Sequence, residues 1–304
     1  MKKIRLGGKV EVPVIGLGCM RMADLSAKDA EQVIQAALDE DIHFFDHADI
    51  YGGGKSEEIF AEAVKNMGIR REELFLQSKC GIRQGMFDFS KEHILNSVDG
   101  ILKRLDTEYI DSLLLHRPDT LVEPEEVAEA FSILEKSGKV RHFGISNHTP
   151  LQIELLKKSV EQDLLINQLQ FSIMHTGMVD AGFNMNMTND PSFDHDNGIL
   201  DYSRLHDMTI QAWSPFQFGF FEGVFLDNDR FPELNAKIDE LADKYHVTNS
   251  AIAVAWIKRH PAKMQTIVGT MNPGRLHDIA KAGDLTLTRE EWYQIYLAAG
   301  NKLP

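Results

Sequence analysis

The sequence predicts a (β/α)8 TIM barrel formed by the whole chain, residues 1–304, with an N-terminal β-hairpin and a C-terminal helix. Short apolar runs alternate with longer amphipathic runs eight times, as repeated strand-and-helix units do. Several of the short runs are apolar nearly throughout, which is typical of strands buried on both faces. No stretch rich in proline, glycine or serine divides the chain, and 43% of its 304 residues are hydrophobic, enough for one large core.

The first two expected strands, 2–6 and 9–12, are joined by Gly7 and Gly8, a two-residue turn that closes a hairpin. Eight predicted pairs of strand and helix follow: 14–18 with 27–40, 42–46 with 56–67, 74–79 with 91–105, 110–116 with 124–137, 140–146 with 150–160, 165–169 with 198–207, 209–213 with 232–259, and 265–270 with 274–282. Aromatic side chains at helical spacing in 285–304 predict a last helix packed on the barrel.

The helix predictions depend on the spacing of apolar residues and on residue types that mark helix ends. In 27–40 apolar side chains recur at the spacing of one helix face, behind Ser26 as a candidate N-cap. Pro124 and Pro150 are first-turn prolines, and Thr149 before Pro150 is a further candidate cap. The alternative fold is a doubly wound open sheet, but no expected strand is followed by a G-x-G-x-x-G turn that opens a helix.

Charge and cysteine content exclude several classes of protein. With 32 basic and 46 acidic residues the net charge is −14, which disfavours nucleic acid and anionic membrane surfaces as partners. Two cysteines are too few for a disulfide framework or a four-cysteine zinc site, and no metal is expected. No signal-type or membrane-spanning apolar run is present, so we expect a cytoplasmic protein, and without a heptad repeat a monomer.

Polar residues stand at the ends of the expected strands, where a barrel carries its chemistry. Asp46, Lys79 and His116 end three consecutive expected barrel strands, and Tyr51 lies in the loop after the first of them. A lysine in a barrel mouth needs a counter-charge, which Asp46 can supply, and an adjacent ammonium lowers the pKa of a tyrosine hydroxyl. With His116 to orient a carbonyl oxygen, these four residues are candidates for a proton-donating catalytic site.

The sequence resembles the aldo-keto reductase family over its whole length. The segment 45–52, Phe-Asp-His-Ala-Asp-Ile-Tyr-Gly, looks like the D-T-A-x-x-Y-G motif of that family, and Lys79 and His116 take the places of its catalytic lysine and histidine. The resemblance implies an oxidoreductase that transfers a hydride from NADPH to a small-molecule aldehyde or ketone. It also implies that Tyr51 is the general acid, that Lys79 and Asp46 tune it, and that His116 positions the carbonyl.

Later segments look like the family's cofactor-binding segments. A nicotinamide carboxamide needs donors and acceptors, which Ser146, Asn147 and Gln168 supply, and an aromatic face, which Trp213 supplies. The remaining cofactor candidates lie in the loop from 214 to 219, for the pyrophosphate, and around the last barrel helix, where a 2′-phosphate and the adenine would bind. They are Ser214, Phe216 and Gly219 in the loop, and Thr270, Arg275 and Asp278 at that helix.

Departures from the family pattern leave some questions open. His47 replaces the motif threonine, and Gly269 and Ile279 stand where many members carry a lysine and an asparagine. NADP(H) is therefore expected over NAD(H) mainly because of Arg275. The alternative function is an NADPH-binding regulatory or sensor subunit with little turnover.

Three further segments are candidate parts of the substrate site. The long polar segment 174–197 is expected to form part of its wall, because long loops in compact barrels are often functional, and the alternative is a plain excursion of the chain on the surface. Arg21 and Arg117 should border the pocket and could accept a carboxylate on the substrate.

Overall fold

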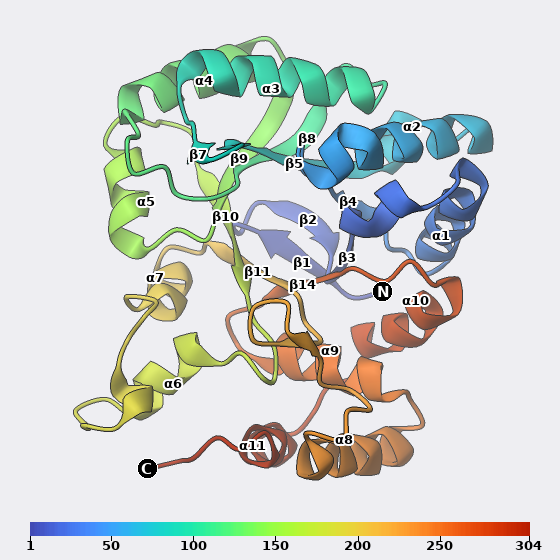
Figure 1. Ribbon diagram of the computed structural model, residues 1–304, viewed down its shortest axis with the longest axis vertical. Coiled ribbons are helices and arrows are strands. Elements are labelled where there is room, and N and C mark those ends of the chain that lie inside the picture. The colour runs from blue at the N-terminus through green and yellow to red at the C-terminus, as the bar shows by residue number, and fades with distance from the viewer.

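Eight parallel strands close into a barrel in the computed structural model, which describes residues 1–304 (Figure 1). Around the barrel the order is β3, β4, β5, β8, β9, β10, β11 and β14, so each strand pairs with the next along the chain and the last with the first. Every observed strand end lies within two residues of its predicted position. The strands are β3 (Ile15–Gly18), β4 (Phe44–Asp46), β5 (Phe75–Cys80), β8 (Ile110–Leu115), β9 (Val140–Ser146), β10 (Leu164–Gln170), β11 (Thr209–Trp213) and β14 (Gln265–Val268).

Helices surround the barrel and cover the outer faces of its strands (Figure 1). Their capping follows the sequence signals: the Ser26 side chain accepts a hydrogen bond from Asp29 N, and Thr149 forms a capping box with Gln152. The helices that follow the strands are α1 (Ala27–Asp39), α2 (Lys55–Met67), α3 (Lys91–Arg104), α4 (Pro124–Lys136), α5 (Pro150–Lys157), α7 (Ile199–Leu205), α8 (Pro232–Tyr245), α9 (Asn249–Arg259) and α10 (Pro273–Ala280).

The predicted N-terminal hairpin closes one end of the barrel. Its strands β1 (Lys3–Leu6) and β2 (Val10–Pro13) pair antiparallel, and Gly7 and Gly8 both have positive φ at the turn. Leu6 and Val12 are buried in a small apolar cluster that includes Phe44 and Leu165, at the N-terminal ends of β4 and β10, and the Gly7 N–H donates to Thr209 at the start of β11. Because the hairpin covers the N-terminal ends, the opposite mouth is the one left open for a ligand.

One predicted helix is wrong in its extent. The run 232–259 forms two helices, α8 and α9, because the chain reverses at His246, which has φ 55° and ends α8 in a left-handed conformation. Thr248 then starts α9. The break places the start of α9 at the open mouth of the barrel, where Asn249 and Ser250 line the main cavity.

The predicted C-terminal helix is α11 (Arg289–Ala298), which packs on α8 and α9. Trp292 stacks on Trp256 of α9 with ring centroids 4.7 Å apart, and each indole N–H donates to the backbone carbonyl of the other residue. The two tryptophans are buried without an unsatisfied polar group, because both indole N–H groups are hydrogen-bonded.

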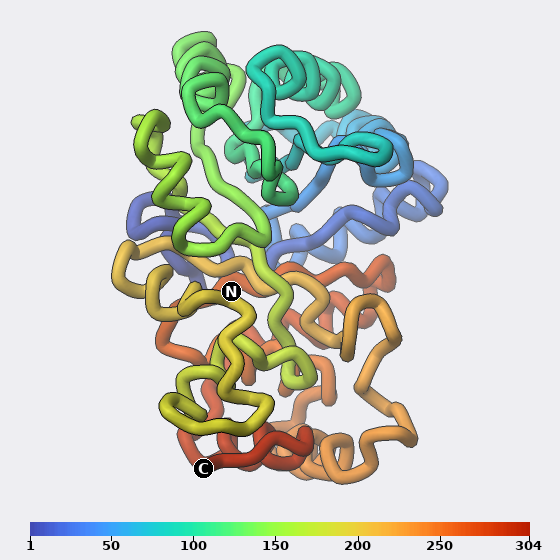
Figure 2. Tube along the Cα trace, turned by 60° about the vertical axis from the view of Figure 1, so that its left-hand side comes forward, coloured from blue at the N-terminus to red at the C-terminus, as the bar shows by residue number.

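The segment 174–197 contains the short helix α6 (Gly177–Phe183) and lies beside α11, as Figure 2 shows for the yellow and red parts of the tube. The Tyr296 hydroxyl donates to Asp180 at 2.6 Å, and Phe183 packs edge-on against the Tyr296 ring.

Two short hairpins lie in the loops after barrel strands: β6 (Ile82–Arg83) pairs with β7 (Met86–Phe87), and β12 (Gln217–Phe218) pairs with β13 (Gly223–Val224). None of the helices has the length and apolar character needed to span a membrane.

Candidate active site

A buried lysine joins three of the predicted site residues at the open end of the barrel. Lys79 Nζ lies 2.8 Å from Asp46 Oδ2, 2.8 Å from the His47 carbonyl oxygen and 3.2 Å from the Tyr51 hydroxyl oxygen. The ammonium thus uses all three of its donors, and the lysine side chain is fully buried. A buried charge is tolerated only with such compensation, so the sequence expectation that Asp46 would partner Lys79 agrees with this geometry.

The pKa values of the lysine and the tyrosine both rise. Burial acts against the charged form of Lys79, but Asp46 and Tyr51 outweigh it and hold the pKa of Lys79 above its ordinary value. Burial raises the pKa of Tyr51, and the charge of Lys79 opposes this without cancelling it. The expectation that Lys79 would lower the pKa of Tyr51 below its ordinary value is therefore wrong in net direction, because desolvation of the phenolate is the larger effect.

A chain of buried glutamines fixes the other oxygen of Asp46. Gln77 Nε2 and Gln168 Nε2 donate to Asp46 Oδ1 at 2.7 and 3.1 Å, and both also donate to Gln211 Oε1 at 2.8 and 3.0 Å. Gln211 in turn donates to Gln265 at 2.7 Å. The barrel interior is therefore a polar, hydrogen-bonded core at this level, which the sequence analysis did not predict.

His116 and Tyr51 approach each other at the mouth. Their ring centroids are 6.1 Å apart at an interplanar angle of 83°. Burial, followed by the charges of Lys79 and Arg117, lowers the pKa of His116 well below its ordinary value, so the ring is neutral at pH 7. Its Nδ1 is buried with no hydrogen-bond partner. An orphaned buried N–H is rarer than an orphaned acceptor, so we assign the proton to Nε2, which makes that nitrogen a donor.

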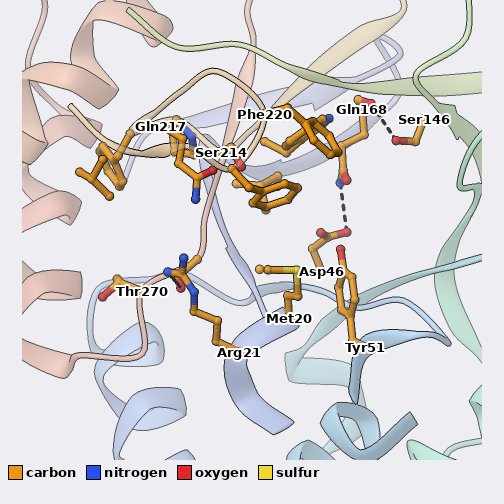
Figure 3. Close-up of a pocket in the computed structure, with 18 of the residues that line it drawn as sticks. Met20, Arg21, Asp46, Tyr51, Ser146, Gln168, Ser214, Gln217, Phe220 and Thr270 are labelled. Carbon is orange, nitrogen blue, oxygen red and sulfur yellow. Dashed lines mark hydrogen bonds between the residues drawn. The ribbon is translucent and has the colours of Figure 1, made fainter. Parts of the chain in front are cut away.

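These side chains open into a cavity of about 650 Å³ at the barrel mouth. In Figure 3 the Tyr51 hydroxyl points toward the Asp46 carboxylate, which a dashed line joins to Gln168, while Arg21 and Thr270 lie at the opposite end. All predicted site residues line this cavity except Lys79, Gly219 and Asp278. Lys79 lies beneath its floor and reaches it through Tyr51.

The predicted carboxamide-binding residues form one hydrogen-bonded group. Ser146 donates to the Gln168 carbonyl oxygen at 2.8 Å, Asn147 donates to Ser146 Oγ at 2.8 Å, and the Trp213 indole N–H donates to Asn147 Oδ1 at 3.3 Å. Asn147 holds this place in a left-handed conformation, φ 61°. The side-chain amide nitrogen of Gln168 is already committed, so Gln168 offers a ligand only its oxygen, an acceptor.

Two of the predicted cofactor residues do not face the cavity. Asp278 accepts from Lys281, the residue that follows α10, at 3.2 Å, and it is not among the residues that line the cavity. Gly219 has a positive φ, and its carbonyl oxygen accepts a hydrogen bond from Gln170 Nε2 at 2.7 Å. Gly219 therefore fixes the shape of the loop and does not present a group to the ligand. Arg275 lines the cavity at the start of α10, where Asn272 caps the helix by accepting from Arg275 N.

Several residues that line the cavity were missed by the sequence analysis. Asp227 accepts from Asn249 Nδ2 at 2.9 Å, which ties the loop after β11 to the start of α9 across the cavity. Phe220 and Phe221 pack against Trp213, with centroids 6.3 and 6.0 Å away. Thr248 is a recognisable N-cap residue type and was a visible signal for the start of α9. Nothing in the sequence indicates that Asp227 contacts this end of the helix.

The cavity fits a dinucleotide with a nicotinamide ring. The Trp213 ring borders one side, Arg21 and Arg275 place positive charge at the other end, and the buried Gln217 Oε1 has no partner within the protein. Arg21 donates to the Gly269 carbonyl at 3.4 Å, so it belongs to this end of the cavity. An elongated anionic ligand with hydrogen-bond donors would satisfy these groups together.

The segment 174–197 does not form a wall of this cavity, so that expectation is wrong. None of its residues is among the lining groups. Because α6 packs on α11, the segment instead borders a second cavity of about 650 Å³, together with Trp292 and Tyr293.

Comparisons with known proteins agree with this geometry. The model of the Aldo/keto reductase family matches residues 14–298. The 6-dehydroglucose reductase of Agrobacterium fabrum is 31% identical, covering 99% of each chain. A crystal structure of a thermostable aldo-keto reductase in complex with the inhibitor epalrestat has a TM-score of 0.78 at 25% identity, covering 98% of this chain and all of the other. A probable voltage-gated potassium channel subunit beta of Arabidopsis thaliana is 26% identical, covering 86% of this chain and 84% of the other.

Proposed function

Since the chain belongs to the aldo/keto reductase family and is an oxidoreductase, we propose that it reduces aldehydes or ketones to alcohols with NADPH. The observation that carries this proposal is the Tyr51 hydroxyl, 3.2 Å from a buried, charged Lys79 and open to a large cavity. A proton donor backed by a cation is what a developing alkoxide requires.

In this proposal Tyr51 is the general acid. NADPH, when bound, supplies the hydride that adds to the carbonyl carbon. The raised pKa keeps the Tyr51 hydroxyl protonated at neutral pH, so the proton is available for the carbonyl oxygen. When the proton leaves, the negative charge on the tyrosine oxygen lies beside the Lys79 ammonium, which stabilises it. Asp46 keeps that ammonium charged and fixed in place.

His116 positions the substrate. With its proton on Nε2, the neutral ring donates a hydrogen bond to the carbonyl oxygen next to Tyr51. Two donors that converge on one oxygen favour the transition state over the planar ground state, because charge builds up on that oxygen.

The cofactor is proposed to lie along the main cavity. Ser146, Asn147 and the oxygen of Gln168 would hold the carboxamide, and the Trp213 ring would pack on the nicotinamide. Ser214, Phe216 and Thr270 line the path to Arg275, which has no carboxylate partner and is free to bind a 2′-phosphate. Two crystal structures of aldo-keto reductase from Klebsiella pneumoniae, each 24% identical to this chain, contain NADP and NADPH respectively, which supports this choice of cofactor.

The test is oxidation of NADPH, followed by its absorbance, with a panel of aromatic and dicarbonyl aldehydes. Wild-type protein should turn over, and Tyr51→Phe should lose about 100-fold or more of kcat. NADPH binding, measured by fluorescence titration, should be unchanged in the variant, since Tyr51 touches the substrate oxygen. If Tyr51→Phe keeps its rate, another group is the acid.

The second candidate function is an NADPH-binding regulatory subunit, suggested by the similarity to a potassium channel subunit beta. The intact set of Asp46, Tyr51, Lys79 and His116 favours the enzyme, since a sensor needs no proton donor. Tight NADPH binding together with no reduction of any carbonyl in the panel would favour the regulatory function.

A further inference from the structure

Arg117 carries a half-buried positive charge that no group in the protein neutralises. Its side chain lines the main cavity, yet its guanidinium makes no hydrogen bond and has no carboxylate within 4 Å. Burial lowers the pKa of Arg117, and no acid lies close enough to oppose this. Three other partly buried arginines are hydrogen-bonded: Arg71 binds Asp111 at 2.6 Å, Arg104 binds Glu57 at 2.7 Å, and Arg259 donates to the Leu287 carbonyl oxygen at 2.7 Å.

The acids near Arg117 are already used. Asp119, two residues along, accepts from Phe89 N at 2.9 Å and from Leu121 N at 2.8 Å, which fixes the loop. Asp46 is held by Lys79 and two glutamines. Partial burial of an arginine without a counter-charge destabilises the free protein. A ligand that brings a negative charge compensates for this desolvation.

The position of Arg117 is on the reactive side of the cavity. It follows His116 directly, and its guanidinium carbon lies 6.0 Å from the ring centroid of Phe220. Arg21, in contrast, donates to Gly269 at the end of the cavity where Arg275 lies. Arg117 is therefore the cation placed for the substrate, and the other two are placed for the phosphates of a cofactor.

We propose that Arg117 binds a carboxylate carried by the carbonyl substrate, so that the preferred substrates are small anionic aldehydes or ketones. This inference rests on the proposed reductase function. Apolar side chains around the same part of the cavity, Met20, Ile50 and Phe220, suit an aliphatic or aromatic body between the two ends. A guanidinium binds a carboxylate through two parallel hydrogen bonds, which also orients the carbonyl toward Tyr51 and His116.

The net charge of −14 makes a local cation necessary for such a substrate. The field of the whole protein repels an anion, so selectivity must come from a charge inside the cavity, where screening by salt is weak. A neutral substrate gains nothing from Arg117, whereas an anionic one exchanges water for a charged partner that is already partly desolvated.

The experiment compares matched substrates on matched variants. The substrates are 3- and 4-carboxybenzaldehyde and the corresponding formylbenzamides, which have the same shape without the charge. The variants are Arg117→Leu, Arg117→Lys and, as control, Arg83→Leu, which removes an exposed arginine paired with Asp88 outside the cavity. Melting temperature and NADPH binding are measured for each variant, so that loss of folding is recognised.

We expect wild-type protein to prefer at least one carboxylate over its amide by about 10-fold or more in kcat/KM. Arg117→Leu should remove this preference by lowering kcat/KM for the acid about 10- to 100-fold, with less than 3-fold change for the amide. Arg117→Lys should restore part of it, and Arg83→Leu should behave as wild type.

Two results would overturn the inference. If the amides are reduced as well as the acids, or if Arg117→Leu slows both equally, the reductase function stands but Arg117 does not select anions. If wild-type protein reduces neither series but reduces other aldehydes of the panel, the inference fails while the reductase function stands, and if it reduces no carbonyl of the panel both fail.

Discussion

Gln77 donates its side-chain amide to Asp46 Oδ1 at 2.7 Å, while Lys79 takes the other oxygen, Oδ2, at 2.8 Å. Asp46 and Gln77 lie directly opposite each other in the pairing of β4 with β5. The same amide also donates to Gln211, and Ser112 donates to the Gln77 oxygen at 3.0 Å. The Gln77 side chain therefore connects the Asp46 carboxylate to the polar interior of the barrel.

We predict that Gln77→Met lowers the free energy of unfolding by about 2 kcal/mol, because the isosteric side chain leaves the hydrogen-bonding groups of Ser112, Asp46 and Gln211 with fewer partners inside the barrel. Chemical denaturation measures this. Gln32→Met, at an exposed position of α1, is the control and should change stability by less than about 0.5 kcal/mol. Equal effects of the two substitutions would show that the glutamine chain adds no stability.

The buried pair of Asp46 and Lys79 should behave as a unit. Asp46→Asn leaves a fully buried ammonium without its counter-charge and should cost about 3 kcal/mol or more. Adding Lys79→Met to Asp46→Asn should recover part of that loss, giving a coupling energy of about 2 kcal/mol or more in a double-mutant cycle.

The exposed pair of Glu154 and Lys157 provides the control cycle, with an expected coupling below about 1 kcal/mol. A coupling of that small size between Asp46 and Lys79 would contradict the role of the carboxylate as the counter-charge. All variants of the buried pair should lose reductase activity, so stability is the measurement that separates them.

The barrel was predictable because its signals are local and periodic. Each strand and each helix reveals itself within a window of about ten residues, and caps such as Ser26 and Thr149 mark where helices begin. Strand ends then bring Asp46, Lys79 and His116 together, since neighbouring parallel strands end at the same edge.

What the sequence did not reveal depends on contacts between distant segments. The break between α8 and α9 occurs at His246, which adopts a left-handed φ although it is not a glycine, and no glycine or proline marks the end of α8 in the sequence. The loop that covers the cavity is held by Asp227 and Asn249, which come together only once the barrel is closed. The segment 174–197 packs against α11 through the hydrogen bond from the Tyr296 hydroxyl to Asp180, two residues that are far apart in sequence.

Arg275 should decide between the two nicotinamide cofactors. Its side chain is exposed at the cavity end with no carboxylate partner, so it is available to the 2′-phosphate that only NADPH carries. Arg275→Ala should raise KM for NADPH about 10-fold and leave KM for NADH unchanged. Arg289→Ala, an exposed arginine outside this cavity, is the control, and equal effects on both cofactors would contradict the prediction.

His47 should make the protein less stable in acid. Its ring is fully buried against Phe60, both ring nitrogens lack partners, and burial lowers its pKa to about 3. Between that value and the ordinary value of about 6.5 the unfolded chain binds a proton that the folded chain does not, so stability falls as pH falls below about 6.5. His47→Leu should therefore gain about 2 kcal/mol relative to wild type between pH 8 and pH 5.

Urea denaturation at the two pH values measures the effect, and the exposed His195→Leu is the matched control. If His47→Leu and wild-type protein have parallel pH profiles, the His47 ring takes up a proton in the folded state through contacts that the structure does not contain.

Asp49 should have the opposite effect. Burial and then the charge of Glu57 raise its pKa to about 7, and its Oδ1 has no hydrogen-bond partner. Between about pH 4 and pH 7 the folded chain retains a proton that the unfolded chain has lost, so stability falls as pH rises through this range. Asp49→Asn, which is uncharged at every pH, should gain about 2 kcal/mol relative to wild type on going from pH 5 to pH 8.

The exposed Asp229→Asn should show no such change, and a pH-independent difference for Asp49→Asn would mean that the carboxylate is already ionised at pH 5. Stability changes with pH through His47 between about pH 3 and 6.5 and, with the opposite sign, through Asp49 between about pH 4 and 7, so the two slopes oppose each other between about pH 4 and 6.5. The double variant His47→Leu/Asp49→Asn should then have a flatter stability profile than either single variant, since each substitution removes one of the two slopes.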